Sequence, residues 1–167
     1  MNEIYIIRHA AAAELDKEIA EDSHRYLTIH GRNHCRIVAG RLKDMKVRFD
    51  LILSSPVIRA VQSAEIFSSI LNFGGEIKTA TELIGGQTFT KFVQMLKRHS
   101  YFNRIALFGH APDVNIFCSN LIKNQDIKNL TINFKNSSVC KIEYDIENEN
   151  GRLVWFLNSE NMKLLEM

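Results

Sequence analysis

Residues 4–10 read Ile-Tyr-Ile-Ile-Arg-His-Ala, a run of four apolar residues that stops abruptly at a charge. A short run of this kind, rich in β-branched residues, is typical of a strand buried on both faces of a parallel sheet. Similar runs occur at residues 51–53 (Leu-Ile-Leu) and 105–108 (Ile-Ala-Leu-Phe). We therefore predict three buried strands, the first over Glu3–Arg8.

Helical patterns follow each of these strands. Apolar residues recur at helical spacing over residues 31–45, 57–71, 89–96 and 114–122, the last after a turn that contains Pro112. Near the C-terminus, residues 139–145 and 153–157 predict a β-hairpin that turns through Asn150-Gly151. Strands that alternate with helices before a terminal hairpin predict an α/β fold, a three-layer α/β/α sandwich with a mostly parallel central sheet.

The composition predicts an ordinary soluble domain. The chain has 167 residues, 46% of them hydrophobic and 24% charged, without a repeat or linker, so we expect one domain over residues 1–167. Lys and Arg number 21 against 19 Asp and Glu, which argues against nucleic acid or an anionic membrane as a partner. The sequence shows neither a spanning apolar run nor a signal-peptide pattern, so we expect a cytoplasmic protein. The three cysteines form no Cys-x-x-Cys pair and have apolar neighbours, which favours buried reduced thiols.

Basic and imidazole side chains follow the predicted strands. Arg8 and His9 end the first strand, Arg59 lies at the entry of the helix after the second, and His110 follows the strand at 105–108. In an open α/β sheet, ligands bind beyond the carboxyl ends of the strands. Guanidinium groups and helix N-termini suit a phosphate dianion, and an unprotonated imidazole can attack phosphorus. These positions together predict a pocket for one phosphoryl group.

The arginine-histidine pair alone identifies nothing, because it recurs at Arg98-His99, where the periodicity predicts the end of a helix. The order of the longer motifs is more specific. The chain resembles the histidine phosphatase superfamily, also called phosphoglycerate mutase-like, and within it the small SixA-like phosphohistidine phosphatase branch. The matching stretches are IYIIRHA (4–10), RYLTIHG (25–31), LILSSPVIRAVQSAEIF (51–67), TELIGG (81–86), IALFGHAPDV (105–114) and NFKNSSVCKIEYD (133–145).

The resemblance implies a phosphoglycerate mutase-like fold and a cofactor-independent phosphatase. It implies that His9 is the nucleophile and becomes transiently phosphorylated. Arg8 and Arg59 would hold the phosphoryl oxygens, and His110 would complete the pocket by donating a hydrogen bond. Glu82 in TELIGG is the nearest candidate for a general acid, with a solvated loop glutamate as the alternative.

This sequence departs from the family pattern at Ala10, where the family usually has glycine after the arginine-histidine pair. Because glycine permits close backbone approach and unusual dihedral angles, Ala10 is expected to shift the loop slightly. The poor match around the general acid favours a leaving group that needs little help. Imidazole leaving phosphohistidine is such a group, whereas an alkoxide benefits greatly from a positioned acid.

The polar stretch from Ala10 to His30 is long for a structureless connection, so it is expected to be locally ordered or functional. Among its residues we select Arg25 as substrate-binding, from the candidates Glu14, Asp16, Lys17, His24 and Arg25. His30 and His34 have a metal-ligand spacing beside Cys35, but no further ligand completes a site at a recognisable spacing. A solvent-facing pair is the better interpretation, and we expect neither a metal nor a cofactor.

Three hypotheses follow for the function. The first is a phosphatase that acts through phospho-His9 on phosphohistidine in a partner protein. The second keeps this enzyme class, with small phosphomonoesters as substrates. The third is a catalytically idle module that binds phosphorylated partners; the presence of both histidines and both arginines disfavours it.

Overall fold

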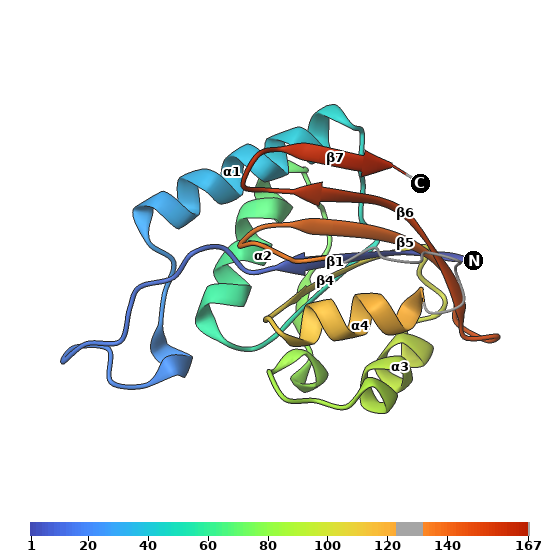
Figure 1. Ribbon diagram of the computed structural model, residues 1–167, viewed down its shortest axis with the longest axis horizontal. Coiled ribbons are helices and arrows are strands. Elements are labelled where there is room, and N and C mark those ends of the chain that lie inside the picture. The colour runs from blue at the N-terminus through green and yellow to red at the C-terminus, as the bar shows by residue number, and fades with distance from the viewer. Residues whose placement is uncertain (123–131, 167) are drawn as a thin grey trace.

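The protein is described by a computed structural model that covers residues 1–122 and 132–166 (Figure 1). The strands are β1 (Asn2–Arg8), β2 (Leu51–Ser54), β3 (Ile77–Thr79), β4 (Arg104–Gly109), β5 (Val139–Asp145), β6 (Asn150–Asn158) and β7 (Lys163–Glu166). The α-helices are α1 (Ile29–Asp44), α2 (Ile58–Ile70), α3 (Phe89–Arg98) and α4 (Asp113–Leu121). Two short 3-10 turns, η1 (Asp22–His24) and η2 (Thr81–Leu83), lie in the connections.

The strands form one seven-stranded sheet in the order β3-β2-β4-β1-β5-β6-β7. The pairs from β3 to β1 are parallel, and β5, β6 and β7 continue the sheet in antiparallel pairs. The predicted buried strands β1, β2 and β4 are therefore neighbours. The edge strands β3 and β7 had no counterpart in our sequence prediction, because three or four largely exposed residues carry too little pattern.

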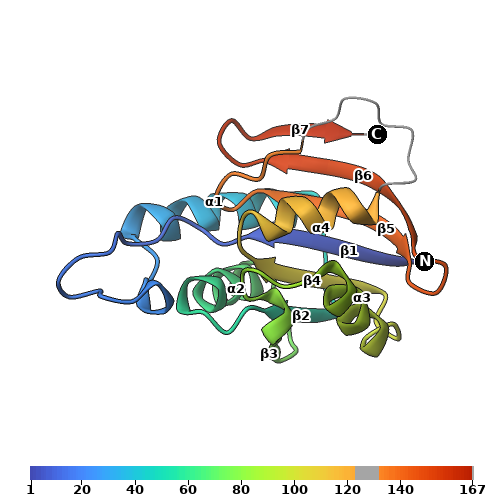
Figure 2. The same cartoon turned by 60° about the horizontal axis from the view of Figure 1, so that its bottom comes forward.

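Alternate side chains of the central strands face opposite layers of helices. Ile4 and Ile6 of β1 pack in one hydrophobic cluster with residues of α3 and α4, such as Phe92 and Phe117. Tyr5 and Ile7 pack in the other cluster with residues of α1 and α2. Because side chains alternate along a strand, a strand covered by helices on both faces is apolar throughout. The three-layer α/β/α arrangement is thereby confirmed, and Figure 2 shows helices on both sides of the sheet.

The terminal hairpin forms as predicted, but its turn lies elsewhere. Asp145 pairs with Asn150 and Tyr144 with Gly151, so the Asn150-Gly151 dipeptide belongs to β6 and the turn covers residues 146–149. Glu149 there has a positive φ of 50°. A Cβ on Gly151 would lie 2.6 Å from the Leu121 carbonyl oxygen, so this glycine is required for close packing rather than for the turn.

The connection between β1 and α1 is ordered, as expected for its length. It folds back on itself through an isolated bridge between Ala12 and Leu27, and η1 lies in this segment. Figure 1 shows it projecting beyond the sheet at the end where β1 stops. Thr28 caps α1 by accepting a hydrogen bond from the Gly31 N–H at 2.9 Å. We call residues 10–28 the β1–α1 loop.

Two further expectations concern the cysteines and the presence of a membrane-spanning helix. The three cysteines are buried and free, as predicted, and burial raises the pKa of the Cys35 thiol to about 12. No helix in the described part of the chain is both long and apolar enough to cross a bilayer.

Candidate active site

The carboxyl ends of β1, β2 and β4 bring the predicted site residues together. His9 follows β1 and its backbone N–H donates to the Gly109 carbonyl at 3.1 Å, which places it beside His110. The two imidazole rings have their centroids 5.0 Å apart. Arg59, in the first turn of α2 after β2, reaches His9 with its guanidinium. Parallel strands thus gather at one edge residues that are up to 101 positions apart in the chain, from His9 to His110.

These side chains line a cavity of about 440 Å³. Arg8, His9, Arg25, Arg59 and His110, all predicted site residues, belong to its lining. The other lining residues are Ala11, Ala12, Glu14, Asp22, Ala111 and Asn136. The β1–α1 loop therefore forms one wall of the cavity, and Glu14 joins Arg25 there as a candidate that the sequence had suggested. We call this cavity the phosphoryl pocket.

The hydrogen bonds of His9 define its tautomer. Nδ1 lies 2.7 Å from the Ala10 carbonyl oxygen, which can only accept, so Nδ1 carries the proton. Arg59 Nε, which can only donate, lies 3.2 Å from Nε2, so Nε2 carries the lone pair. Burial, reinforced by His110, Arg59 and Arg8, lowers the pKa of His9 to about 3. His9 is therefore neutral at physiological pH and has its Nε2 lone pair directed toward the guanidinium.

Arg59 bridges His9 and a carboxylate of the β1–α1 loop. Its two terminal nitrogens donate to Asp22, one to the backbone carbonyl at 2.6 Å and one to Oδ2 at 2.8 Å. Arg25 donates to Oδ1 of the same carboxylate at 3.0 Å. These two arginines lower the pKa of Asp22, which stays ionised at neutral pH. The sequence analysis did not select Asp22; its only sequence signal is the i,i+3 spacing from Arg25.

The ring of His110 is held by a hydrogen bond with the hydroxyl group of Ser55. Its Nε2 lies 2.8 Å from Ser55 Oγ, whereas its buried Nδ1 has no hydrogen-bond partner among residues 1–122 and 132–166. Burial, with Arg59 as the next contribution, lowers the pKa of His110 to about 4. When the Ser55 hydroxyl donates to Nε2, the ring proton of the neutral imidazole is on Nδ1. Ser55 itself is fully buried and directly follows β2.

Arg8 and the backbone carbonyl groups of Arg8 and His9 are held by the segment before β5. Arg8 donates from a terminal nitrogen to the Phe134 carbonyl at 2.7 Å, and burial lowers its pKa. Asn136 donates from its amide to the His9 carbonyl at 3.1 Å, and the Ser137 N–H donates to the Arg8 carbonyl at 3.0 Å. Asn136 was missed as a pocket residue, although it lies in one of the stretches that carry the family resemblance.

Glu82 is not brought to the phosphoryl pocket. It lies in η2, outside the pocket lining, and its carboxylate pairs with Arg98, the last residue of α3. Its pKa is lowered, because hydrogen bonds and the nearby Arg98 outweigh its burial. The expectation of a general acid at Glu82 therefore has no support in this geometry.

The second arginine-histidine pair, Arg98-His99, ends a helix, as predicted, with His99 at the C-cap.

Ala10 fits its position without strain. It is fully buried, its N–H donates to Ser63 Oγ at 3.0 Å, and it is not among the residues with positive φ. A left-handed conformation, the usual reason to require glycine, is not needed here. Alanine is therefore compatible with the backbone conformation at this site.

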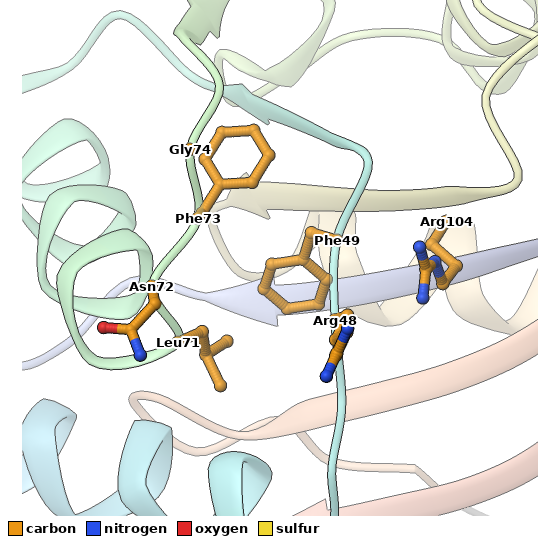
Figure 3. A pocket seen from close by; sticks show the side chains of 7 residues that line it. All are labelled: Arg48, Phe49, Leu71, Asn72, Phe73, Gly74 and Arg104. Carbon is orange, nitrogen blue, oxygen red and sulfur yellow. The ribbon is translucent and has the colours of Figure 1, made fainter.

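A second cavity, of about 260 Å³, lies at the opposite end of the sheet (Figure 3). It is lined by Arg48, Phe49, residues 71–74 and Arg104. Arg104 is already paired with Asp50, and the lining contains no histidine, cysteine or carboxylate. This cavity therefore lacks a nucleophile or an acid-base group, and the phosphoryl pocket is the better catalytic candidate.

His30 and His34 lie in α1 with their rings parallel, 6.2 Å between centroids. In the described part of the chain, no group of three or more histidine, cysteine, aspartate or glutamate side chains is placed to hold a metal ion. His34 instead has its Nε2 2.8 Å from the Ser159 carbonyl oxygen. The pair therefore faces the segment after β6.

Comparison with known proteins agrees with this geometry. A family model described as histidine phosphatase superfamily (branch 1) matches residues 4–84, which include Arg8, His9 and Arg59. The phosphohistidine phosphatase SixA of Escherichia coli is 27% identical over 167 residues, covering 97% of each chain. The chain is therefore similar to the histidine phosphatase superfamily over its N-terminal half and to SixA over nearly its whole length.

Solved structures show the same similarity. A structure of the protein histidine phosphatase SixA complexed with tungstate superposes with a TM-score of 0.84 and 28% identity, covering 96% of this chain and 99% of that one. A phosphoserine phosphatase of Entamoeba histolytica, at 13% identity, shares the fold with a TM-score of 0.68, covering 98% of this chain and all of that one. The chain thus has the fold of SixA, which is the phosphoglycerate mutase-like fold that the sequence motifs predicted.

Proposed function

We propose that this phosphatase removes the phosphoryl group from phosphohistidine in a partner protein, with His9 as the transient acceptor. His9 Nε2 is unprotonated because burial depresses the pKa, and Nδ1–H is anchored on the Ala10 carbonyl. An imidazole fixed in this tautomer presents its lone pair without first losing a proton. Arg8, Arg59 and Arg25 line the same pocket and supply the donors for the phosphoryl oxygens.

The reaction has two displacements at phosphorus. In the first, the Nε2 lone pair of His9 forms a P–N bond while the P–N bond of the substrate breaks, and the departing imidazole takes a proton from a water molecule, which becomes hydroxide. In the second, water attacks phospho-His9 and the P–N bond breaks, which restores neutral His9 and releases phosphate as its monoanion; this monoanion gives a proton to the hydroxide. His110, with Nδ1 free to donate, is assigned to the oxygens of the transferring group.

The observation that carries the choice of substrate is the set of carboxylates around the pocket. Glu82 lies outside the lining and is paired with Arg98, Asp22 is held ionised by Arg59 and Arg25, and Glu14 belongs to the lining as a solvent-exposed side chain. An ionised carboxylate cannot protonate an alkoxide as it leaves. The leaving nitrogen of phosphohistidine is basic enough to take its proton from water. A P–N substrate therefore suits this pocket better than an ordinary phosphate ester does.

The test is a side-by-side turnover assay on a histidine-phosphorylated protein and on an aryl phosphate, with wild type and His9→Ala. We expect wild type to prefer the phosphohistidine substrate to the aryl phosphate, and to prefer it to an alkyl phosphate by at least about 100-fold in kcat/KM, because only the alkoxide needs the missing general acid. His9→Ala is expected to lose both activities. A preference for the aryl phosphate would favour small phosphomonoesters as substrates. Normal turnover by His9→Ala would refute the mechanism, and phosphate binding without turnover by wild type would indicate a binding module.

A further inference from the structure

A third hollow, of about 480 Å³, adjoins the phosphoryl pocket. We call it the side groove, and its lining residues are Ala11, His30, His34, Lys135, Asn136, Ser159 and Glu160. Ala11 and Asn136 line both hollows, so the side groove begins two residues after the nucleophile His9. The two hollows are therefore adjacent, with Ala11 and Asn136 bordering both of them.

The floor of the side groove is a buried network of hydrogen bonds. Ser159, only 1% exposed, donates from Oγ to the Asn136 carbonyl at 2.6 Å, and its N–H donates to Ser138 Oγ at 3.2 Å. Asn136 in turn donates to the His9 carbonyl at 3.1 Å. The floor and the nucleophile are thus fixed by the same side chains, which makes the groove a preformed surface rather than a gap between mobile segments.

The remaining lining residues present both donors and acceptors. His30 is exposed at the start of α1 and stacks at 5° on His34, whose Nε2 lies at the Ser159 carbonyl. Lys135 and Glu160 form an exposed ion pair at 3.6 Å. The set has no excess of one charge, so it does not suit a second phosphate. Peptide groups, which each carry one donor and one acceptor, match such a lining.

We infer that the side groove binds the polypeptide that flanks the phosphohistidine of the substrate. This inference rests on the proposed function and adds a location for the substrate's main chain. The phosphoryl-imidazole group fills the phosphoryl pocket, and the chain that carries it passes over Ala11 and Asn136 into the groove. A free phosphorylated amino acid or a small ester uses the first hollow alone. The groove therefore distinguishes a protein substrate from a small one.

The experiment compares two probes that share one reactive group: free N-phosphohistidine and a ten-residue peptide with phosphohistidine at its centre. Wild type is expected to hydrolyse the peptide about ten-fold more efficiently in kcat/KM, the gain of one or two well-formed contacts. The double variant His30→Ala/Lys135→Ala is expected to lose this advantage and to keep its activity on free phosphohistidine. Arg41→Ala/Lys163→Ala, which removes exposed side chains of α1 and β7 outside the groove, is the matched control and is expected to behave as wild type.

The outcomes separate the two proposals. Equal efficiency on both probes in wild type, or an advantage that survives in the groove variant, overturns the groove assignment and leaves the proposed function standing. Loss of the advantage in the control variant also overturns it, because the effect would then not be local. Hydrolysis of neither probe, together with turnover of an aryl phosphate, overturns the proposed function and the groove assignment with it.

Discussion

Replacing Asp22 by asparagine should tighten the binding of inorganic phosphate. The Asp22 carboxylate accepts from Arg59 at 2.8 Å and from Arg25 at 3.0 Å, and both arginines line the phosphoryl pocket. A phosphate ion that recruits these guanidinium groups must compete with this carboxylate. Asparagine keeps the size and one acceptor oxygen but removes the charge, so the competition weakens.

The size of the effect follows from the exposure of the pair. A hydrogen bond to a charged partner contributes about 1.5–3 kcal/mol. The Asp22 side chain is 58% exposed, so solvent screening reduces its competing contribution to about 1 kcal/mol. That corresponds to a roughly five-fold lower inhibition constant for phosphate. The assay is competitive inhibition by phosphate against a fixed substrate at pH 7.5.

Glu21→Gln provides the matched control. Glu21→Gln removes the same charge one residue away. Among the described residues, the Glu21 carboxylate contacts only Ser23 and His24, and it does not line the pocket. Its phosphate affinity should stay within two-fold of wild type, a change of at most about 0.4 kcal/mol. Weaker phosphate binding in Asp22→Asn would show that the carboxylate positions Arg59 for the substrate rather than competing with it. Equal tightening in both variants would attribute the effect to net charge alone.

Three further predictions test the burial of the imidazoles, the packing of the loop and the role of Glu82. His9 and His110 have folded pKa values of about 3 and 4, below the unfolded value of 6.5, so their stabilisation is present above pH 6.5 and is lost as pH falls toward 4. The free energy of unfolding measured in urea should fall by about 2 kcal/mol per histidine between pH 7.5 and 5.0. In His110→Asn the total fall should be smaller by the contribution of one histidine. A free energy of unfolding that does not change with pH would contradict the burial of neutral rings. Gly31→Ala would place a Cβ 2.1 Å from the Ala11 carbonyl, so it should lower both unfolding free energy and turnover, whereas Gly40→Ala, with nothing within 4 Å, should stabilise α1 by about 0.5–1 kcal/mol. Glu82→Gln should keep kcat/KM on an alkyl phosphate, whose alkoxide leaving group benefits from a positioned acid, within about two-fold of wild type; a fall of about 100-fold or more would restore Glu82 as a general acid.

The core of the site could be predicted because topology alone assembles it. His9, Arg59 and His110 directly follow, or lie within a turn of, three short apolar runs that were recognisable as buried strands. Once those strands are parallel neighbours, their carboxyl ends lie at one edge whatever the loops do. The helix faces were equally readable, since the inward residues of α4, such as Phe117 and Leu121, occur at helical spacing and are buried.

Asp22 and Asn136 could not be found in this way, because no periodic pattern determines their positions. Asp22 reaches Arg59 only because the β1–α1 loop folds back through the Ala12–Leu27 bridge. Asn136 bonds to the His9 carbonyl across 127 positions of sequence, in a segment fixed by the antiparallel pairing of β5 with β1. Loop paths and antiparallel returns depend on contacts between distant segments.

The position of the hairpin turn was predicted wrongly for the opposite reason. Here the local sequence signal was strong, but packing overruled it. Asn-Gly is a preferred turn dipeptide, yet Gly151 lies in β6, opposite Tyr144. Its lack of a side chain is needed where the Leu121 carbonyl and the Tyr144 ring approach. The turn then moves to residues 146–149, where Glu149 adopts the positive φ that the glycine would have taken more easily.

The charges of the phosphoryl pocket explain why a nearly neutral protein suits a single phosphoryl group. The pocket contains three arginines, but Asp22 already engages two of them, and Glu14 lies in the same lining. One dianion can displace the Asp22 carboxylate from Arg59 and leave the local charge close to balance. A substrate with a second phosphate would bring that charge against Asp22 and Glu14, with no further arginine in the lining to receive it.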